Sequence, residues 1–525
     1  MPKSATIVPL SGNRDIDGIL WGVKWTLPAL TYSFPTQLDQ FTGHPDGAID
    51  GFRPLRAAQI KAVNDIADQL NSLIGIDLQF TPDAASANIR LSTASSLKLP
   101  GFADSGKIET AIGLSPDQTR VPTYAFGDIF FNRVDYAKPM VGTYAYQTIM
   151  HELGHALGLK HGHATQPSPG GDSVITKLPA SHDTLEYSVM TYRSCLGWTV
   201  EYGYTNDTNS FPQSFMMNDI AALQYLYGAD YTHNAGDTTY SWNSKTGEMS
   251  IDGKTRGRPA DSKVFLTIWD GGGNDTYDLS SYGLGALDID LGAGGFSVFS
   301  SLQLALLKVD SGIYARGNVY NALLHEGNIR SLIENAIGGD GRDSLTGNQI
   351  DNMLVGNDNA DLLFGLRGAD TLDGGDGYDV LTGGPGDDFL MGGRDADELL
   401  GGSGNDRLDG GRAGGDQLVG GLGNDIFVVG RYDQLEDFSP EGARNNDIIE
   451  LDSAVFLKLH PGRLELSQFQ SSNTDEALSA DIRLFYENDQ GNLYYDRDGD
   501  GPHPATFIAN LRGSPLIGPD DIYII

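Results

Sequence analysis

Three histidines and one glutamate lie within residues 151–161 of the chain, which read HELGHALGLKH. On a helix, His151 and His155 project from the same face because they are four residues apart, so both imidazoles can bind one tetrahedral ion at about 2.0–2.1 Å. Gly158 can adopt the positive φ that ends a helix, which would return His161 to the same ion. Three imidazoles that leave a fourth position open predict a catalytic zinc site.

Glu152 directly follows the first histidine, close to this open position. Zinc lowers the pKa of a bound water to about 7, and a neighbouring carboxylate can accept the proton as the water attacks a carbonyl. Glu152 is therefore the candidate general base of a hydrolase. The short pattern HExxH also occurs in unrelated helices whose histidines only pack or cap, but here the longer eleven-residue pattern is complete.

A second element follows downstream at residues 188–192, which read SVMTY. The long histidine motif followed by this methionine resembles the signature of the metzincin metalloproteases. That resemblance implies that Met190 forms an apolar floor beneath the histidines. It also implies that Tyr192 ligates the zinc and swings away to donate a hydrogen bond to the developing oxyanion, as in the serralysin and astacin branches.

A nine-residue repeat begins at Gly338 and continues for ten units, with one extra residue in the unit that begins at Gly410. Glycines open the units, the sixth residue is nearly always Asp, and the eighth is apolar and expected to point inward. This is the RTX nonapeptide, which predicts a parallel β-roll with calcium held between turns eighteen residues apart. A Gly/Asp-rich stretch is more often a flexible linker, but the near-strict register of Asp and Leu favours the roll.

The calcium ligands that the repeat predicts are turn glycines and sixth-position aspartates. They are Gly339, Gly341, Asp343, Asp361, Gly368, Asp370, Gly375, Gly377, Asp379, Gly384, Gly386, Asp388, Asp397, Gly402, Gly404, Asp406, Asp416 and Asp425. Asn352 offers a neutral side chain at a sixth position, so we expect the site that it shares with Asp370 to be the weakest. The extra residue is expected to distort the far end of the column that contains Asp416.

The metzincin motif followed by RTX repeats resembles the serralysin family of secreted bacterial zinc metalloproteases, over most of residues 15 to 430. Residues 269–278 look like the calcium-binding entry of that family into its roll, which adds Asp270, Gly272 and Asp275 to the calcium ligands. Residues 219–228 are similar to the helix that closes its protease domain. The chain departs from the family at Gly162-His163, where Pro-Gly is common.

The expected fold is multidomain: an α+β metzincin protease domain, then an all-β calcium-binding parallel β-roll with a C-terminal β extension. The expected parts are a weakly structured leader or prosegment at 1–15, the protease domain at 16–235, the roll domain at 236–430 with its repeats at 338–429, and a C-terminal β region at 431–525. Apolar spacing predicts a helix at 55–75. Residues 128–132 are predicted to be an edge strand that pairs with an extended substrate.

Composition limits the partners. A formal net charge of −35 and a pI near 4.4 argue against nucleic acid or an anionic membrane, because phosphate binding needs a basic surface. Cys195 is the only cysteine, so no intramolecular disulfide can form, and we expect an inert thiol. We find no apolar run that could span a bilayer and no N-terminal signal-peptide core, so we expect export by another route.

The family resemblance implies that a type I secretion apparatus exports the chain and reads an uncleaved C-terminal signal. The chain ends in residues 520–525, DDIYII, which fit such a signal but would equally suit a last edge strand. We therefore expect a secreted, extracellular, monomeric protein with one zinc and several calcium ions. The resemblance also raises a periplasmic inhibitor protein as a partner.

Three functions remain open at this point. The first is a zinc endopeptidase of broad specificity that cleaves proteins or peptides. The second is a processing protease of narrow specificity, with a cleft shaped by the loop at 162–185. The third is a non-catalytic calcium-dependent adhesin, which should lack Glu152 or a histidine ligand, and none is missing. The acidic run at 496–501 favours a hairpin turn, with a weak calcium site as the alternative.

Overall fold

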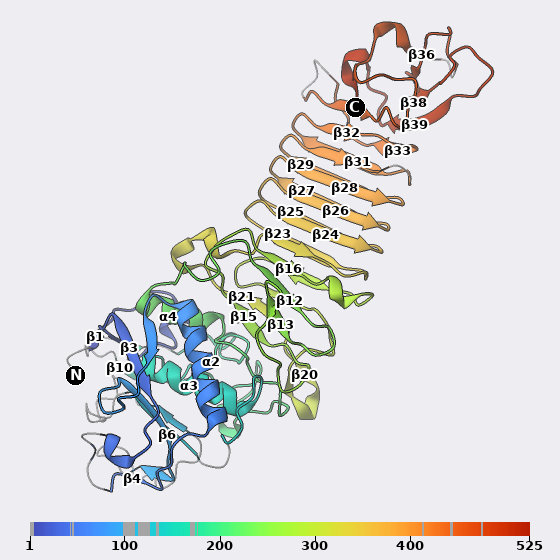
Figure 1. Ribbon diagram of the computed structural model, residues 1–525. Coiled ribbons are helices and arrows are strands. Elements are labelled where there is room, and N and C mark those ends of the chain that lie inside the picture. The colour runs from blue at the N-terminus through green and yellow to red at the C-terminus, as the bar shows by residue number, and fades with distance from the viewer. Residues whose placement is uncertain are drawn as a thin grey trace. The chain divides into compact units, whose positions relative to one another are not determined.

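The computed structural model describes residues 5–41, 44, 47–97, 111–113, 127–132, 136–167, 174–175, 177–411, 414–440, 445–473 and 476–525. The chain forms two compact units (Figure 1). Unit 1 comprises Met1–Thr238, Trp242–Gly273 and Ala293–Leu332, and unit 2 comprises Thr239–Ser241, Asn274–Gly292 and Ile333–Ile525. Each unit contains three segments of the chain, so the chain passes between the units more than once. The domain boundaries at 235 and 430 remain predictions.

Unit 1 contains a five-stranded sheet and three main helices. The strand order is β5 (Asp77–Phe80), β3 (Ala29–Ser33), β6 (Ile89–Thr93), β9 (Asp128–Phe131) and β8 (Ala111–Gly113). The helices are α2 (Ala57–Leu73), α3 (Tyr144–Leu157) and α4 (Met217–Tyr227). The helix predicted at 55–75 is thus confirmed. None of the helices in the described part of the chain is long and apolar enough to span a membrane.

Strand β9 lies between β6 and β8, so the prediction that residues 128–132 form an edge strand is wrong. It pairs in parallel with β6 and antiparallel with β8. All four of its side chains are buried, as expected for a strand covered on both faces. Among the described strands, the edge on this side of the sheet is β8.

Residues 5–17 include a short strand and a short helix, which differs from the expectation of a weakly structured leader at 1–15. Strand β1 (Ala5–Ile7) pairs antiparallel with β2 (Val23–Trp25), and the short helix α1 (Arg14–Asp17) lies between them. The Asp17 carboxylate accepts hydrogen bonds from the backbone of Ser11 and Gly12. Removal of this segment as a prosegment remains a prediction.

Shorter strands complete unit 1. They are β4 (Ile49–Asp50), β7 (Ser96–Leu97), β10 (Gln166–Pro167), β11 (Val174–Ile175), β13 (Met249–Ile251), β14 (Lys254–Thr255), β15 (Leu266–Ile268), β18 (Phe296–Ser297), β19 (Leu306–Lys308), β20 (Ile313–Tyr314) and β21 (Val319–Asn321).

Unit 2 is built on two parallel sheets that the chain enters in turn, so that β23 to β31 stack as a ladder (Figure 1). One sheet contains β12 (Thr239–Trp242), β16 (Thr276–Asp278), β22 (Asn335–Ile337), β24 (Met353–Asp358), β26 (Thr371–Asp376), β28 (Phe389–Arg394), β30 (Arg407–Asp409) and β32 (Ile426–Val428). The other contains β17 (Asp288–Asp290), β23 (Ser344–Asn348), β25 (Leu362–Leu366), β27 (Val380–Pro385), β29 (Glu398–Ser403), β31 (Gln417–Leu422) and β33 (Asp433–Leu435).

The eighth residue of every repeat fills the interior of this roll. These residues are 0% exposed in all ten units: Leu345, Leu354, Leu363, Leu372, Leu381, Leu390, Leu399, Leu408, Leu418 and Phe427. Within one sheet, Leu345, Leu363 and Leu381 are direct neighbours, eighteen residues apart. The inward apolar ladder predicted from the repeat is confirmed.

Seven further strands follow the roll. They are β34 (Ile448–Leu451), β35 (Gly462–Arg463), β36 (Phe469–Ser472), β37 (Leu484–Glu487), β38 (Asn492–Tyr495), β39 (Thr506–Leu511) and β40 (Ile522–Ile524). Strand β40 lies between β34 and β35, so the alternative that the terminal residues form an edge strand is wrong. Residues 496–501 join the antiparallel strands β38 and β39, which confirms the hairpin turn.

The sixth-position aspartates form two columns. The backbone N–H of each aspartate donates to Oδ1 of the next one, as from Asp361 to Asp379 (2.8 Å) and from Asp379 to Asp397 (2.9 Å). The step from Asp397 to Asp416 crosses the inserted residue and is also 2.9 Å. The inserted residue therefore does not lengthen this hydrogen bond, although we expected a distortion at Asp416. Residues 412–413 of that unit lie outside the described residues.

The first glycine of each unit packs against the sixth-position side chain, which is Asn352 in one unit and lies six residues further on, at Asp416, in the unit with the inserted residue. A Cβ at Gly383 would lie 2.2 Å from Oδ2 of Asp388, and one at Gly374 would lie 2.5 Å from Oδ2 of Asp379. All ten units begin with glycine. The repeat therefore needs glycine here because the carboxylate occupies the volume of a side chain.

We expect Gly383→Ala to destabilise unit 2 by about 1–3 kcal/mol, the usual effect of overpacking a dense interior. The matched control is Gly285→Ala, because the nearest heavy atom to a Cβ there is 3.6 Å away. Denaturant unfolding followed by the β signal in circular dichroism would measure both. Equal effects of the two substitutions would contradict the packing argument.

Candidate metal centre

Helix α3 positions the first two histidines. Thr143 caps its N-terminus through a hydrogen bond that its side chain accepts from Tyr146 N. The helix ends at Gly158, which has a φ of 106° in the left-handed region, as predicted. A Cβ at Gly158 would also lie 2.4 Å from the carbonyl oxygen of Val23. Both the positive φ and this close contact therefore require glycine at position 158.

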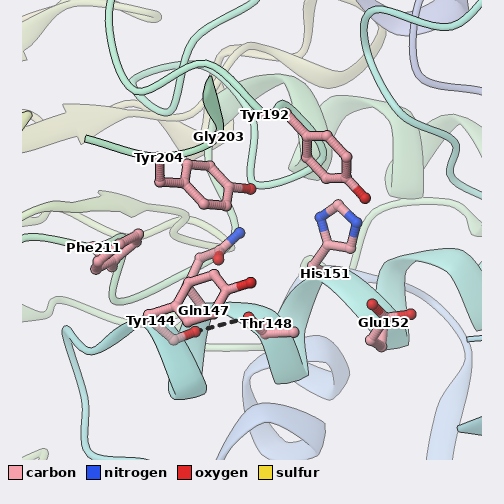
Figure 2. A pocket seen from close by; sticks show the side chains of 9 residues that line it. All are labelled: Tyr144, Gln147, Thr148, His151, Glu152, Tyr192, Gly203, Tyr204 and Phe211. Atoms are coloured by element: carbon pink, nitrogen blue, oxygen red, sulfur yellow. Dashed lines mark hydrogen bonds between the residues drawn. The ribbon is translucent and has the colours of Figure 1, made fainter. Parts of the chain in front are cut away.

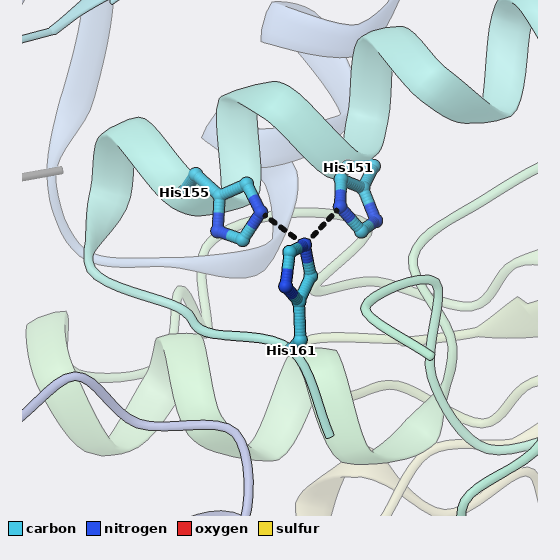
Figure 3. A group of neighbouring side chains, drawn as sticks. All are labelled: His151, His155 and His161. Atoms are coloured by element: carbon cyan, nitrogen blue, oxygen red, sulfur yellow. Dashed lines mark hydrogen bonds between the residues drawn. The ribbon is translucent and has the colours of Figure 1, made fainter. Parts of the chain in front are cut away.

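The three histidine side chains converge (Figure 3). Nε2 of His161 lies 3.1 Å from Nε2 of His151 and 3.0 Å from Nε2 of His155. Two nitrogens bound to one tetrahedral zinc at 2.0–2.1 Å would be about 3.3 Å apart, so the cluster is close to that geometry. Among the described residues, this is the one group of three or more His, Cys, Asp or Glu side chains whose ligand atoms all lie within 4.8 Å of one another.

The backbone fixes the orientation of two of these rings. Nδ1 of His151 lies 2.8 Å from the carbonyl oxygen of Val189, and Nδ1 of His155 lies 2.8 Å from that of Leu159. Each Nδ1–H can therefore donate to a carbonyl, which leaves the lone pair of Nε2 for a metal ion.

The imidazoles are held in their neutral form. Burial, together with the neighbouring His155, lowers the pKa of His151 to about 3, and burial lowers that of His155 to about 4. Burial and the neighbouring histidines also lower the pKa of His161. A metal binds the neutral imidazole, so the donor set fits zinc in charge as well as in spacing.

The turn at residues 188–192, here called the Met-turn because it contains Met190, packs against α3. A Cβ at Gly154 would be 2.8 Å from Sδ of Met190, so the motif needs glycine there to seat the methionine. Asp219 of α4 holds this turn, because its carboxylate accepts from Ser188 Oγ (2.6 Å) and Val189 N (2.7 Å). Burial raises the pKa of Asp219 to about 7.

Glu152 and Tyr192 both line a cavity of about 440 Å³ beside His151 (Figure 2). Glu152 is 5% exposed, and the hydroxyl of Tyr192 lies 3.0 Å from Nε2 of His161. The structure thus brings all five predicted catalytic and zinc-binding residues together. The rings of Tyr144, Tyr204 and Phe211 form the aromatic part of the cavity wall.

Several residues around the site were missed by sequence reasoning. Gln147 donates to the carbonyl oxygen of Val189 (3.0 Å), the same acceptor that His151 uses. The ring of His163 stacks on that of His161, with centroids 5.4 Å apart and planes 8° apart. Lys160 is fully buried between the second and third ligands. The sequence signal for these three residues is their position within or close to the histidine motif. That position alone does not predict which atoms they contact.

The predicted calcium residues do not form a cluster of three side chains in the described structure. Asp270 accepts from Gly272 N (2.7 Å), and Asp275 N donates to Glu334 (2.7 Å). The turn glycines Gly368, Gly375, Gly377, Gly384, Gly386, Gly402 and Gly404 have positive φ, whereas Gly339 and Gly341 are not among the glycines with positive φ.

Eight column aspartates each bury an Oδ2 atom that has no hydrogen-bond donor. They are Asp361, Asp370, Asp379, Asp388, Asp397, Asp406, Asp416 and Asp425. Asp343 differs, because Leu287 N donates to its Oδ1 and Gly339 N donates to its Oδ2. Two further residues, Asp433 and Asp447, extend the columns and likewise have backbone donors on both oxygens.

The amide of Asn352 is satisfied within the protein. Its Oδ1 accepts from Asn348 N (2.7 Å), and its Nδ2 donates to the carbonyl oxygen of Glu334 (2.8 Å). This agrees with the expectation of a weak site there, which remains a prediction. Part of the loop at 162–185, residues 168–173 and 176, lies outside the described residues.

Comparisons with known proteins agree with this geometry. Serralysin of Proteus mirabilis is 32% identical over 353 residues, which cover 64% of this chain and 63% of that protein. Serralysin G of Dickeya chrysanthemi is 30% identical over 329 residues (62% and 60%), and Metalloprotease AprA of Pseudomonas entomophila strain L48 is 34% identical over 226 residues (41% and 39%). The chain thus spans less than two thirds of the length of these relatives.

The family model for the peptidase M10 serralysin C-terminal domain matches residues 229–520, which is more than half of the chain. This match includes all ten repeats and the strands that follow them as far as β39. The chain therefore belongs to the peptidase M10 serralysin family.

Proposed function

We propose that the chain is a secreted zinc endopeptidase of broad specificity, with His151, His155 and His161 as zinc ligands. The convergence of three neutral imidazoles beside a buried carboxylate carries this proposal. When bound, zinc would polarise the scissile carbonyl and lower the pKa of the attacking water. The names of the relatives, serralysin and metalloprotease, support the same assignment.

Glu152 takes the role of general base. Its position next to His151 on α3, at the wall of the same cavity, lets its carboxylate receive the proton of the attacking water and pass it to the leaving amine. Tyr192, whose hydroxyl lies 3.0 Å from Nε2 of His161, would help to hold the metal in the resting site and would donate a hydrogen bond to the developing oxyanion. Burial raises the pKa of Tyr192 above its ordinary value, so the hydroxyl retains its proton and can act as a donor.

Broad specificity follows from recognition of the substrate main chain. Among the described strands, β8 is the edge of the sheet next to β9, and an extended peptide can pair with it through backbone hydrogen bonds. The cavity beside His151 then receives one side chain among aromatic rings. A panel of peptides that differ in sequence separates this proposal from a narrow processing protease, which would cleave few of them.

We also propose that calcium occupies the roll and that a type I apparatus exports the chain. The eight buried carboxylate oxygens without a donor support the calcium sites, because an unpaired buried charge needs a cation. Asp343, whose two oxygens both have backbone donors, contributes less to cation binding than the aspartates between it and Asp433.

Glu152→Gln should retain zinc but lose most of the peptidase activity, by about 10²–10⁴-fold, because the ligands remain while the amide cannot accept a proton. Zinc content by atomic absorption and casein hydrolysis with and without a zinc chelator would measure this. Glu201→Gln, at an exposed position, is the control. Activity close to that of the unchanged chain would rule out Glu152 as the base.

Tyr192→Phe should reduce kcat by about 10²–10³-fold, which is the usual cost of removing one oxyanion donor. Tyr225→Phe is the matched control, because that hydroxyl binds the carbonyl oxygen of Pro9, outside the cavity. Steady-state kinetics on one peptide would compare the two. An unchanged kcat in Tyr192→Phe would leave Tyr192 with a structural role only.

Stability of the roll should depend on pH in opposite directions with and without calcium. Burial and neighbouring carboxylates raise the pKa of Asp361 to about 8 and that of Asp397 to about 7, against about 4 in the unfolded chain. The metal-free folded roll therefore binds more protons than the unfolded one, and its stability should fall as the pH rises from about 4 to about 8.

With calcium the ion replaces these protons, so the roll should instead lose stability as the pH falls through the same window. Thermal unfolding of unit 2 at pH 5 and pH 8, in excess calcium and in excess chelator, would test both signs. Identical melting with and without calcium at pH 8 would show that packing alone holds the roll.

A further inference from the structure

Lys160 lies between the second and third histidine ligands, and its side chain is fully buried. Within the described residues, its ammonium donates to the backbone carbonyl oxygens of Gly18, Ala164 (2.8 Å) and His161 (3.4 Å). Two of these acceptors belong to the loop that carries the third ligand, and one belongs to the N-terminal segment. The ammonium therefore joins two parts of the chain that are far apart in sequence.

Burying an ammonium costs several kcal/mol unless its donors are satisfied, so such a group persists where its bonds are nearly complete. Lysine has three N–H donors, and the described residues offer the ammonium backbone carbonyl oxygens as acceptors. The carboxylate of Asp183, which is also buried, provides a nearby negative charge. The surroundings of Lys160 are therefore built for a cation that bonds to backbone.

Residues 18–21, here called the N-terminal strap, lie along the turn between His155 and His161. The backbone N–H of Lys160 donates to Ile19 O (2.7 Å), and that of Trp21 donates to Gly158 O (2.9 Å). Leu20 and Leu159 form a β-bridge. The strap thus fixes the chain up to Lys160, and the ammonium extends this support to residues 161–164.

The third ligand needs such support more than the other two. His151 and His155 are held by the helical backbone and by the bonds from their Nδ1 atoms to carbonyl oxygens. His161 lies beyond the end of α3, on a loop. A flexible third ligand would release the metal more readily, because ligands that are not oriented beforehand lose more conformational entropy on binding.

We infer that Lys160 is a positioning residue for the metal site: its ammonium fastens the loop of His161 to the N-terminal strap and so sets how long the metal is retained. This inference rests on the proposed zinc site. It assigns to Lys160 no contact with substrate.

The test measures zinc release from the full chain into an excess of a chromophoric chelator. Lys160→Met removes the three donors but keeps a similar side-chain length, and it should release zinc about 10–100-fold faster, as is usual when the partner that orients a ligand is lost. Lys160→Gln keeps two donors without the charge and should fall between Lys160→Met and the unchanged chain. Casein hydrolysis at saturating zinc serves as a second readout.

Lys24→Met is the matched control. Lys24 also belongs to the N-terminal part of the chain and donates to a backbone carbonyl, that of Leu226, away from the third ligand. It should release zinc at the rate of the unchanged chain. Faster release in Lys160→Met and Lys160→Gln, but not in Lys24→Met, is the expected result.

Three other outcomes would overturn the inference. Equal acceleration in Lys24→Met and Lys160→Met would indicate general loosening of unit 1. A lower unfolding temperature in Lys160→Met, with wild-type zinc release from its folded fraction, would make Lys160 a stability residue only. If Lys160→Met does not fold, zinc release from Lys160→Gln provides the test. Zinc release from Lys160→Gln at the rate of the unchanged chain would contradict the inference. An unchanged chain that binds no zinc would instead refute the proposed function itself.

Discussion

Closely grouped atoms that can bind a cation are the constraint on which this structure depends. In unit 1, Nε2 of His161 lies 3.0 Å from Nε2 of His155 and 3.1 Å from Nε2 of His151. In unit 2, eight carboxylate oxygens are buried without a hydrogen bond. Such atoms destabilise a fold that contains protein alone, because their desolvation is not offset. Under the proposed function, zinc would bind the imidazole nitrogens of unit 1 and calcium would bind the carboxylate oxygens of unit 2.

The two units bury these atoms by different means. Around the histidines, each contact that holds the helix and the loop occurs once. Gly154 packs against Met190, and the carboxylate of Asp219 accepts a hydrogen bond from the Met-turn. In the roll, one contact recurs along the repeats, since the first glycine of each unit meets the sixth-position side chain, a carboxylate in all units but that of Asn352. A substitution in the roll alters one coil among several, whereas a substitution near the histidines has no second copy to compensate.

The sequence predicts the convergence of the three histidines because its determinants are local. The spacing of His151 and His155 and the glycine at 158 depend only on helix geometry. The failed predictions concern contacts between distant segments. The apolar run of β9 shows that the strand is buried, but it does not show that β8 lies on its second edge. Asp433 and Asp447 stand 17 and 22 residues after the aspartates they follow, outside the nine-residue register that identifies the others.

The inserted residue in the roll shows how this architecture responds to changes in length. Asp397 and Asp416 are 19 residues apart, yet their hydrogen bond matches those between aspartates 18 apart. Each coil contacts only its neighbours, so the stack behaves as a one-dimensional array whose stability grows by addition of similar increments. Whole coils of two units could thus be gained or lost in evolution while the flanking coils keep their geometry. Selection could therefore change the length of the roll without changing the residues around the three histidines.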